Sequence, residues 1–168
     1  LLTKSSNGDN AVAKNLLATM YEQGLGVKKD PAKALEFYLA SAKLGNGLAQ
    51  NRLGNIYQNG EGVAQDLNKA LGYFRAAAAQ GLGAAIFNVG VYYEDGRTVD
   101  KDPAKAFQYF LNAGAKGLSL AQHKAGLYYM NGVGTHRDTV AGRAWFDLAA
   151  KQGFAPAQTQ LALLYEKG

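Results

Sequence analysis

The feature that most constrains this chain is a 36-residue period that runs through its 168 residues without an insertion. Tyrosine recurs at every step, and in each copy glycine follows it three residues later. A fixed period of this length is typical of proteins built from stacked copies of one supersecondary unit, so the sequence predicts a tandem repeat. The recurring tyrosines are Tyr21, Tyr57, Tyr93, Tyr129 and Tyr165.

Each copy has the pattern of two helices joined by a loop that contains glycine. In the first helix, Ala13, Leu17 and Tyr21 are spaced by four residues, which places them on one face of a 3.6-residue helix. Gly24 then stands where a left-handed glycine would end that helix. The pair Asp30-Pro31 predicts the start of the second helix, because Asp is a good N-cap and Pro suits the first turn.

Small residues alternate with aromatic pairs, which predicts closely packed helices. Glycines such as Gly54, Gly90 and Gly126 let helices approach, and the aromatic side chains fill the remaining space. One isolated helix pair is too small to offset an ordering cost of about 1–2 kcal/mol per residue, so neighbouring pairs must stack. The predicted fold is therefore all-α, a right-handed α/α superhelical solenoid of 36-residue helix-turn-helix repeats.

The period also sets the expected boundaries of the copies. We expect residues 1–10 to be the end of a preceding repeat and residues 155–168 to be the first helix of a further one. The chain would then be a fragment of a larger protein. The complete repeats between these ends are expected at 11–46, 47–82, 83–118 and 119–154.

Composition narrows the classes of function. The chain has no cysteine, which excludes disulfides, zinc-thiolate sites and cysteine nucleophiles. Its formal net charge is +5, but the 18 basic residues are scattered, with no run longer than two, so a nucleic-acid groove is not predicted. No apolar stretch reaches the roughly 20 residues of a membrane helix, and we expect no membrane insertion in this segment.

No motif in the sequence predicts catalysis. The stretch from Gly24 to Lys29 pairs Gly-x-Gly with two lysines, but it lacks the third glycine and the preceding strand of a dinucleotide site. His123 and His136 have no further ligand pair at helical spacing, so no metal is expected. There is no G-x-S-x-G elbow. We predict a protein that is not an enzyme, with no catalytic residue, metal or cofactor.

The repeat resembles a known family at specific positions. Residues 53–63 have the pattern Leu-Gly-x-x-Tyr-x-x-Gly-x-Gly-Val, and residues 66–74 have Asp-x-x-Lys-Ala-x-x-Tyr-Phe. The pattern closes with Ala-Ala-x-x-Gly at 77–81. It is similar to the Sel1-like repeat, a relative of the tetratricopeptide repeat, over essentially the whole chain. The resemblance implies an α/α superhelix and an adaptor or scaffold role in protein complexes, as in bacterial envelopes and endoplasmic-reticulum quality control.

Three departures from the family pattern matter. Thr98 replaces the second loop glycine, so we expect the loop after Gly96 to bend differently. Ala141 and Gly142 stand where Lys-Ala is usual. Cysteine-rich bacterial relatives cross-link each hairpin with a disulfide, which this chain cannot form.

Two alternative functions stay open. β-Lactam hydrolysis, claimed for the cysteine-rich relatives, is one of them, although no ordered nucleophile is visible. End-to-end self-association of the repeat array is another.

A partner-binding face can be assigned by analogy. The first helices of tetratricopeptide solenoids line a concave groove, so residues opposite their buried side would face a protein or peptide partner. Asn51 and Asn55 would clamp a peptide backbone, and Phe87 and Leu127 would be apolar anchors. Alternatively, the superhelix buries the apolar residues between helices or against missing repeats. The candidate residues are Asn15, Thr19, Glu22, Asn51, Asn55, Gln58, Phe87, Val91, Glu94, His123, Leu127 and Met130.

The compartment is expected from weaker signals. Short, exact repeats with scattered lysines favour a bacterial protein, and we expect a periplasmic or secreted one. The endoplasmic-reticulum lumen and the cytoplasm are the alternatives. The absence of an Asn-x-Ser/Thr sequon argues against a glycoprotein of the endoplasmic reticulum.

Overall fold

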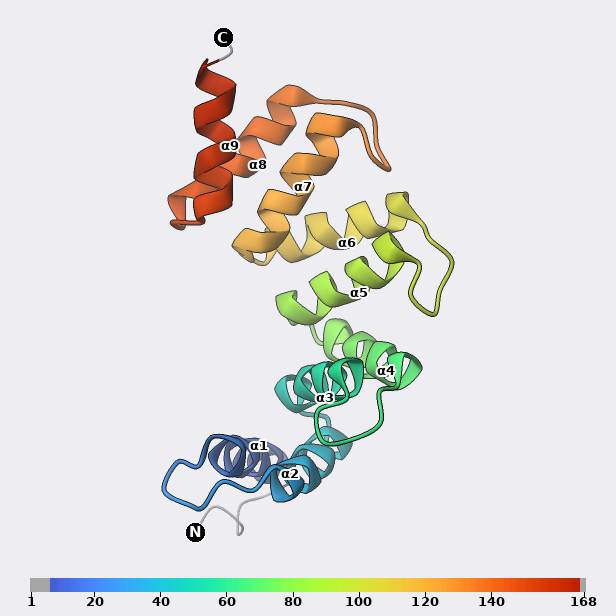
Figure 1. Ribbon diagram of the computed structural model, residues 1–168, viewed down its shortest axis with the longest axis vertical. Coiled ribbons are helices and arrows are strands. Elements are labelled where there is room, and N and C mark those ends of the chain that lie inside the picture. The colour runs from blue at the N-terminus through green and yellow to red at the C-terminus, as the bar shows by residue number, and fades with distance from the viewer. Residues whose placement is uncertain (1–6, 167–168) are drawn as a thin grey trace. The chain divides into compact units, whose positions relative to one another are not determined.

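The computed structural model describes residues 7–166, and this part of the chain consists of nine α-helices and no strand (Figure 1). The prediction of an all-α fold built from helical repeats is confirmed. The helices are α1 (Asn7–Gln23), α2 (Pro31–Lys43), α3 (Gly47–Asn59), α4 (Leu67–Ala79), α5 (Gly83–Asp95), α6 (Pro103–Ala115), α7 (Ser119–Asn131), α8 (Thr139–Lys151) and α9 (Ala155–Glu166).

The chain divides into two compact units between Leu82 and Gly83. In the first unit α1 packs on α2, α2 on α3, and α3 on α4 (Figure 1). In the second unit the same order runs from α5 to α9. Each unit therefore stacks helical hairpins through their second and first helices, as the repeat predicts. The right-handed sense of the superhelix stays a prediction.

The second helix of every complete repeat begins at an aspartate, as predicted. The Asp30 side chain accepts a hydrogen bond from the backbone N–H of Lys33 at 3.0 Å, and Asp66 accepts one from Lys69 at 2.9 Å. Asp102 and Asp138 cap α6 and α8 in the same way. Each cap satisfies one of the orphan N–H groups at a helix start, an interaction worth about 1 kcal/mol.

The loops between paired helices also repeat, and here one expectation is wrong. Gly24 and Gly26 adopt left-handed φ values of 77° and 69°. Thr98, which replaces the second loop glycine, takes the same conformation with φ 57°. The reason is that both ends of the loop are fixed, since the Asp102 N–H bonds the Tyr93 carbonyl at 2.9 Å, as the Asp30 N–H bonds Tyr21. Thr98 therefore keeps the bend at a cost of about 1–2 kcal/mol.

The beginning of α1 differs from the equivalent helices. It starts at Asn7, ahead of position 11 where the first complete repeat was expected to begin. In the later repeats a positive-φ glycine such as Gly45 or Gly81 separates one helix from the next. Asp9 stands at that position here, so no glycine ends the helical run. Residues 1–6, assigned to a preceding repeat, lie outside the described residues.

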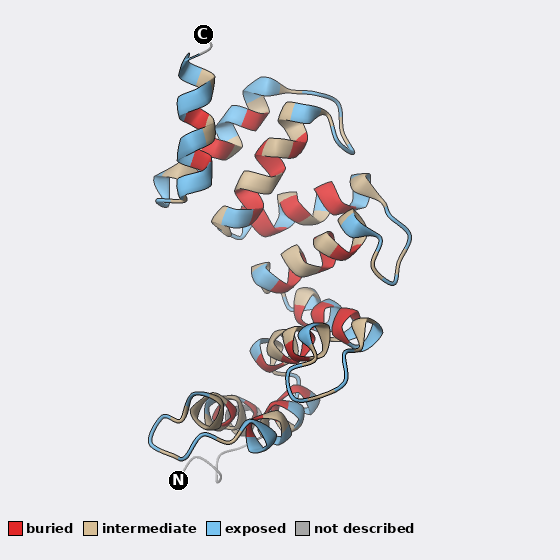
Figure 2. Ribbon diagram, in the orientation of Figure 1, coloured by how far each residue is buried: buried red, intermediate tan, exposed pale blue. Residues whose placement is uncertain are grey.

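Glycine and aromatic residues meet where paired helices cross. Buried residues form stripes along the helices, while the loops are mostly exposed (Figure 2). Three glycines of the first helices lie directly under a ring from the second helix, as the spacing of small and large residues predicted. A Cβ atom would lie 2.4 Å from the ring of Phe74 at Gly54, 2.8 Å from Phe110 at Gly90, and 2.6 Å from Phe146 at Gly126.

Candidate partner-binding site

The polar candidate side chains of the first unit are partly buried and not fully exposed to solvent. Thr19 Oγ1 donates to the Asn15 carbonyl at 3.1 Å and lies 3.3 Å from Tyr38 Oη. Asn51, Asn55 and Gln58 on α3 are half-buried, and Asn51 makes interactions of its own. A role of these side chains in clamping a peptide stays a prediction.

The apolar candidates of the second unit pack on its core. Phe87 lies 5.2 Å, centroid to centroid, from Phe110, and Val91 packs on the same cluster. Leu127 and Met130 pack against the cluster that contains Phe146. These side chains are half-buried, so they contribute to folding whether or not they also contact a partner.

His123 lies between two aromatic rings, with centroids 5.5 Å from those of both Phe146 and Phe154. Its Nε2 is buried and has no hydrogen-bond partner among the described residues. Burial, with a smaller contribution from the charge of Lys124, lowers the pKa of His123. The folded state therefore favours the neutral imidazole.

This environment predicts a pH-dependent stability. The unfolded histidine titrates near pH 6.5, about its ordinary value, while the folded one resists protonation. The unfolded state then binds more protons, so stability is fully present above that pH and is lost as the pH falls toward the lower pKa of the folded state. Urea unfolding between about pH 7.5 and 5.5 should show this loss. His123→Gln should reduce it. An unchanged pH profile in His123→Gln would contradict the assignment.

A more exposed apolar row lies on the same helices. Its members stand at one repeat position, near the start of each first helix. Helical spacing places this position on the face predicted to bind a partner, and it is apolar in each complete copy. Val12 is 61% exposed, Leu48 is 59% exposed, and Leu120 is 40% exposed.

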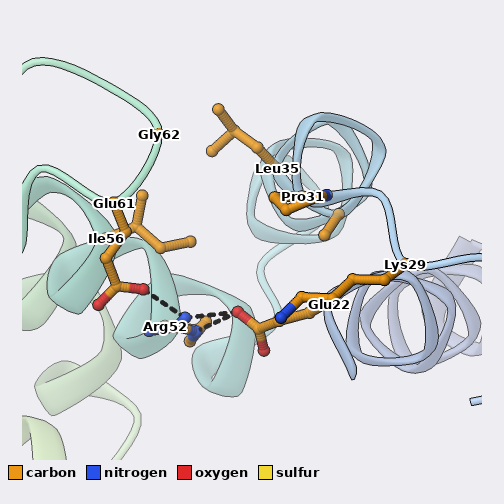
Figure 3. Close-up of a pocket in the computed structure, with 9 residues that line it drawn as sticks. Glu22, Lys29, Pro31, Leu35, Arg52, Ile56, Glu61 and Gly62 are labelled. Carbon is orange, nitrogen blue, oxygen red and sulfur yellow. Dashed lines mark hydrogen bonds and ion pairs between the residues drawn. The ribbon is translucent and has the colours of Figure 1, made fainter. Parts of the chain in front are cut away.

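A charged cluster joins the two hairpins of the first unit. Arg52 Nε donates to Glu22 Oε1 at 2.7 Å, and its Nη2 contacts Glu22 and Glu61 (Figure 3). Tyr38 Oη donates to the other Glu22 oxygen at 2.9 Å. Glu22, a predicted site residue, is thus paired with Arg52 of the next repeat.

The pKa values follow from these contacts. Burial opposes the charge of Arg52, but the hydrogen bonds to Glu61 and Glu22 outweigh it and raise the Arg52 pKa. The hydrogen bond from Arg52 is also the main cause of a lowered pKa at Glu61. Burial, together with the hydrogen bond to Glu22, raises the pKa of Tyr38. The ion pair of Arg52 with Glu61 and the proton of Tyr38 therefore persist around neutral pH.

The second unit contains an equivalent cluster. Lys124 Nζ donates to both oxygens of Glu94, at 2.9 and 2.8 Å, and Tyr128 Oη donates to Glu94 at 2.9 Å. Burial, and then the hydrogen bond to Glu94, raises the pKa of Tyr128. Glu94 lies 72 residues after Glu22, and Lys124 lies 72 after Arg52. The intervening repeats carry Gln58 and Asn88 at these positions.

A pocket opens beside each cluster. The first has a volume of about 370 Å³ and is bounded by Glu22, Lys29, Pro31, Ala34, Leu35, Arg52, Ile56, Glu61 and Gly62 (Figure 3). The second, of about 290 Å³, is bounded by Glu94, Lys101, Pro103, Lys124, Leu127, Tyr128, Asn131 and Val133.

These arrangements suit binding better than acid–base chemistry. Glu22 and Glu94 each accept hydrogen bonds from a cation and a tyrosine, which are contacts of structural ion pairs. Within the described residues, no group of three or more His, Asp and Glu side chains is placed to hold a metal ion. None of the described helices is both long and apolar enough to cross a bilayer.

Fold and pockets together define a helical repeat protein with potential binding surfaces, and sequence comparison gives its family. The Sel1 repeat model matches residues 11–46, 47–82, 83–118, 119–154 and 155–168. The chain therefore belongs to the Sel1 repeat family, whose members are generally protein–protein interaction scaffolds. No curated protein matches the chain.

Solved structures of bacterial proteins are similar to it. A protective antigen of uropathogenic Escherichia coli with an SLR fold is 36% identical, with a TM-score of 0.89 over 94% of this chain and 34% of the antigen. A Sel1 repeat protein from Oxalobacter formigenes is 35% identical, with a TM-score of 0.88 over 93% of this chain and 64% of that protein. Cysteine-rich protein B of Helicobacter pylori is 25% identical, with a TM-score of 0.62 over 81% of this chain and 98% of that protein. The chain thus spans about a third of the antigen's length.

Proposed function

We propose that this chain is a non-catalytic scaffold that binds a segment of another protein along the first helices of its repeats. The observation that carries the proposal is the exposed apolar row, Val12, Leu48 and Leu120. Exposed leucines at one repeat position are better explained by a partner than by folding, since they bury little surface within the chain.

In each unit, one exposed leucine of the row lies close to a pocket. Leu48 is four residues before Arg52, and Leu120 is four residues before Lys124. Residues at this spacing lie on one face of a helix, so each exposed leucine lies one turn from the cation of a pocket. The combination of an apolar anchor and a polar pocket is the usual composition of a recognition site.

The setting that we propose is the bacterial envelope or the exterior of the cell. The similarity to bacterial structures, one of them described as a protective antigen, supports it. A location study with an epitope-tagged chain would test this part, and exclusive recovery from the cytoplasm would overturn it.

Peptide selection from a random phage-displayed library tests the binding function. Peptides enriched on the wild-type chain should bind the double variant Leu48→Asn/Leu120→Asn at least about tenfold more weakly, equivalent to roughly 1.4 kcal/mol. The matched control is Val140→Asn/Leu148→Asn, which alters exposed apolar residues of α8 and should bind within about twofold of wild type.

Two results of the peptide selection would overturn the proposal. One is no reproducible enrichment of any peptide, and the other is an equal loss of peptide affinity in both double variants. Circular dichroism should show all three proteins folded, because the substituted side chains are exposed. Light scattering on the same samples shows whether the preferred partner is instead a second copy of the chain.

A further inference from the structure

We infer that the two equivalent pockets each receive an acidic side chain from an extended protein segment, with a neighbouring aliphatic residue against the pocket wall. This inference rests on the proposed scaffold function and adds the chemistry of the partner. It concerns the pocket beside Glu22 and Arg52 and the pocket beside Glu94 and Lys124.

Each pocket contains a lysine that no described carboxylate engages. Glu22 and Glu61 already share Arg52, and Glu94 is paired with Lys124. Lys29 and Lys101 line the same pockets and are exposed, and neither forms an ion pair or hydrogen bond with another described residue. In Figure 3 the Lys29 side chain extends into the pocket toward Glu22. An incoming carboxylate would meet an available ammonium group, whereas an incoming cation would find its carboxylate engaged.

Each pocket also has an aliphatic wall. Pro31, Leu35 and Ile56 supply it in the first unit. Pro103, Leu127 and Val133 supply it in the second. An isolated anion would use none of this surface. A carboxylate followed by an aliphatic side chain would use both parts, because apolar contact contributes about 25 cal/mol per Å² buried.

The site occurs twice, with the same local sequence. Residues 29–34 and 101–106 both read Lys-Asp-Pro-Ala-Lys-Ala. The intervening repeat has Gln65 where these have lysine, and its aspartate is followed by Leu67 instead of proline. Each unit therefore offers one site of the same chemistry to an acidic side chain. The net charge of +5 would also favour the approach of an acidic segment.

A synthetic peptide of alternating Glu and Leu, about a dozen residues long and labelled with rhodamine, is the direct probe. Its binding to the full chain is measured by fluorescence anisotropy at about 0.15 M salt, where non-specific charge attraction is screened within about 8 Å. The matched peptide has Gln in place of every Glu. Two double variants of the chain have the same net charge, Lys29→Met/Lys101→Met in the pockets and Lys28→Met/Lys116→Met outside them.

The inference expects the Glu-Leu peptide to lose about tenfold in affinity for Lys29→Met/Lys101→Met and less than about twofold for Lys28→Met/Lys116→Met. The Gln-Leu peptide should bind wild type about as weakly as the Glu-Leu peptide binds the pocket variant. Equal losses in both double variants, equal binding of both peptides, or no binding would overturn it. Equally effective competition by single-stranded DNA would do the same.

Failure here can be told apart from failure of the proposed function. If peptides selected from the library depend on Leu48 and Leu120 but carry no acidic residues, the scaffold function stands and the acidic partner does not. If the library yields no peptide, the scaffold function itself fails.

Discussion

Replacing Gly54 by alanine should lower the free energy of unfolding by about 1–3 kcal/mol, which is the usual cost of overpacking a core. The added Cβ would lie 2.4 Å from the Phe74 ring, a distance that real contacts do not reach. Phe74 is fully buried, so its ring cannot move away without disturbing α4 and its neighbours. Urea denaturation followed by circular dichroism measures the change as a lower midpoint.

Gly72 provides a matched control in the same hairpin. It lies inside α4, is exposed, and has no atom within 4 Å of a built Cβ. Gly72→Ala should therefore stabilise the chain by about 0.5–1 kcal/mol, because alanine loses less backbone entropy on entering a helix. The two substitutions are chemically identical, so opposite signs isolate the packing contribution. Equal effects would mean that the glycine–aromatic contact is not what holds α3 close to α4.

Phe87→Ala should destabilise the chain by about 2 kcal/mol. A fully buried Phe→Ala substitution costs about 3–5 kcal/mol, and Phe87 is only half-buried, beside Phe110 on the cluster that includes Tyr128. The same urea titration measures the effect. Leu48→Ala, at a residue that is 59% exposed, should change stability by less than about 0.5 kcal/mol.

The comparison also tests where a partner binds. If Phe87→Ala leaves stability unchanged but weakens the binding of selected peptides, Phe87 is an anchor of the groove, as the sequence suggested. If stability falls and Leu48→Ala weakens binding, the leucine row is the docking surface and Phe87 belongs to the core.

Local features of the fold could be predicted because each depends on a few neighbouring residues. The N-cap at Asp30 needs only the N–H groups of the following turn. The left-handed turn at Gly24 needs only the freedom of glycine. The left-handed conformation of Thr98 does not follow from residue propensity, because it is imposed by the fixed ends of its loop.

The candidate site was predicted less completely. Helical spacing identified Glu22 and Glu94 as residues of one face, but their partners Arg52 and Lys124 lie 30 residues further on, in the next repeat. Comparison at the 36-residue step hides these pairs, since Gln58 and Met130 replace glutamate in the alternate copies. Comparison at 72 residues would have shown them.

The sequence by itself determined the repeat, its helical pairs and the family, because strict periodicity repeats the same local physics in every copy. Only the tertiary structure decided which side chains remain available. Phe87 packs on Phe110, Glu22 pairs with Arg52, and Lys29 forms no ion pair or hydrogen bond with another described residue. The physical reason is that burial and ion pairing depend on contacts between successive hairpins, and the spacing of residues along one helix does not specify them.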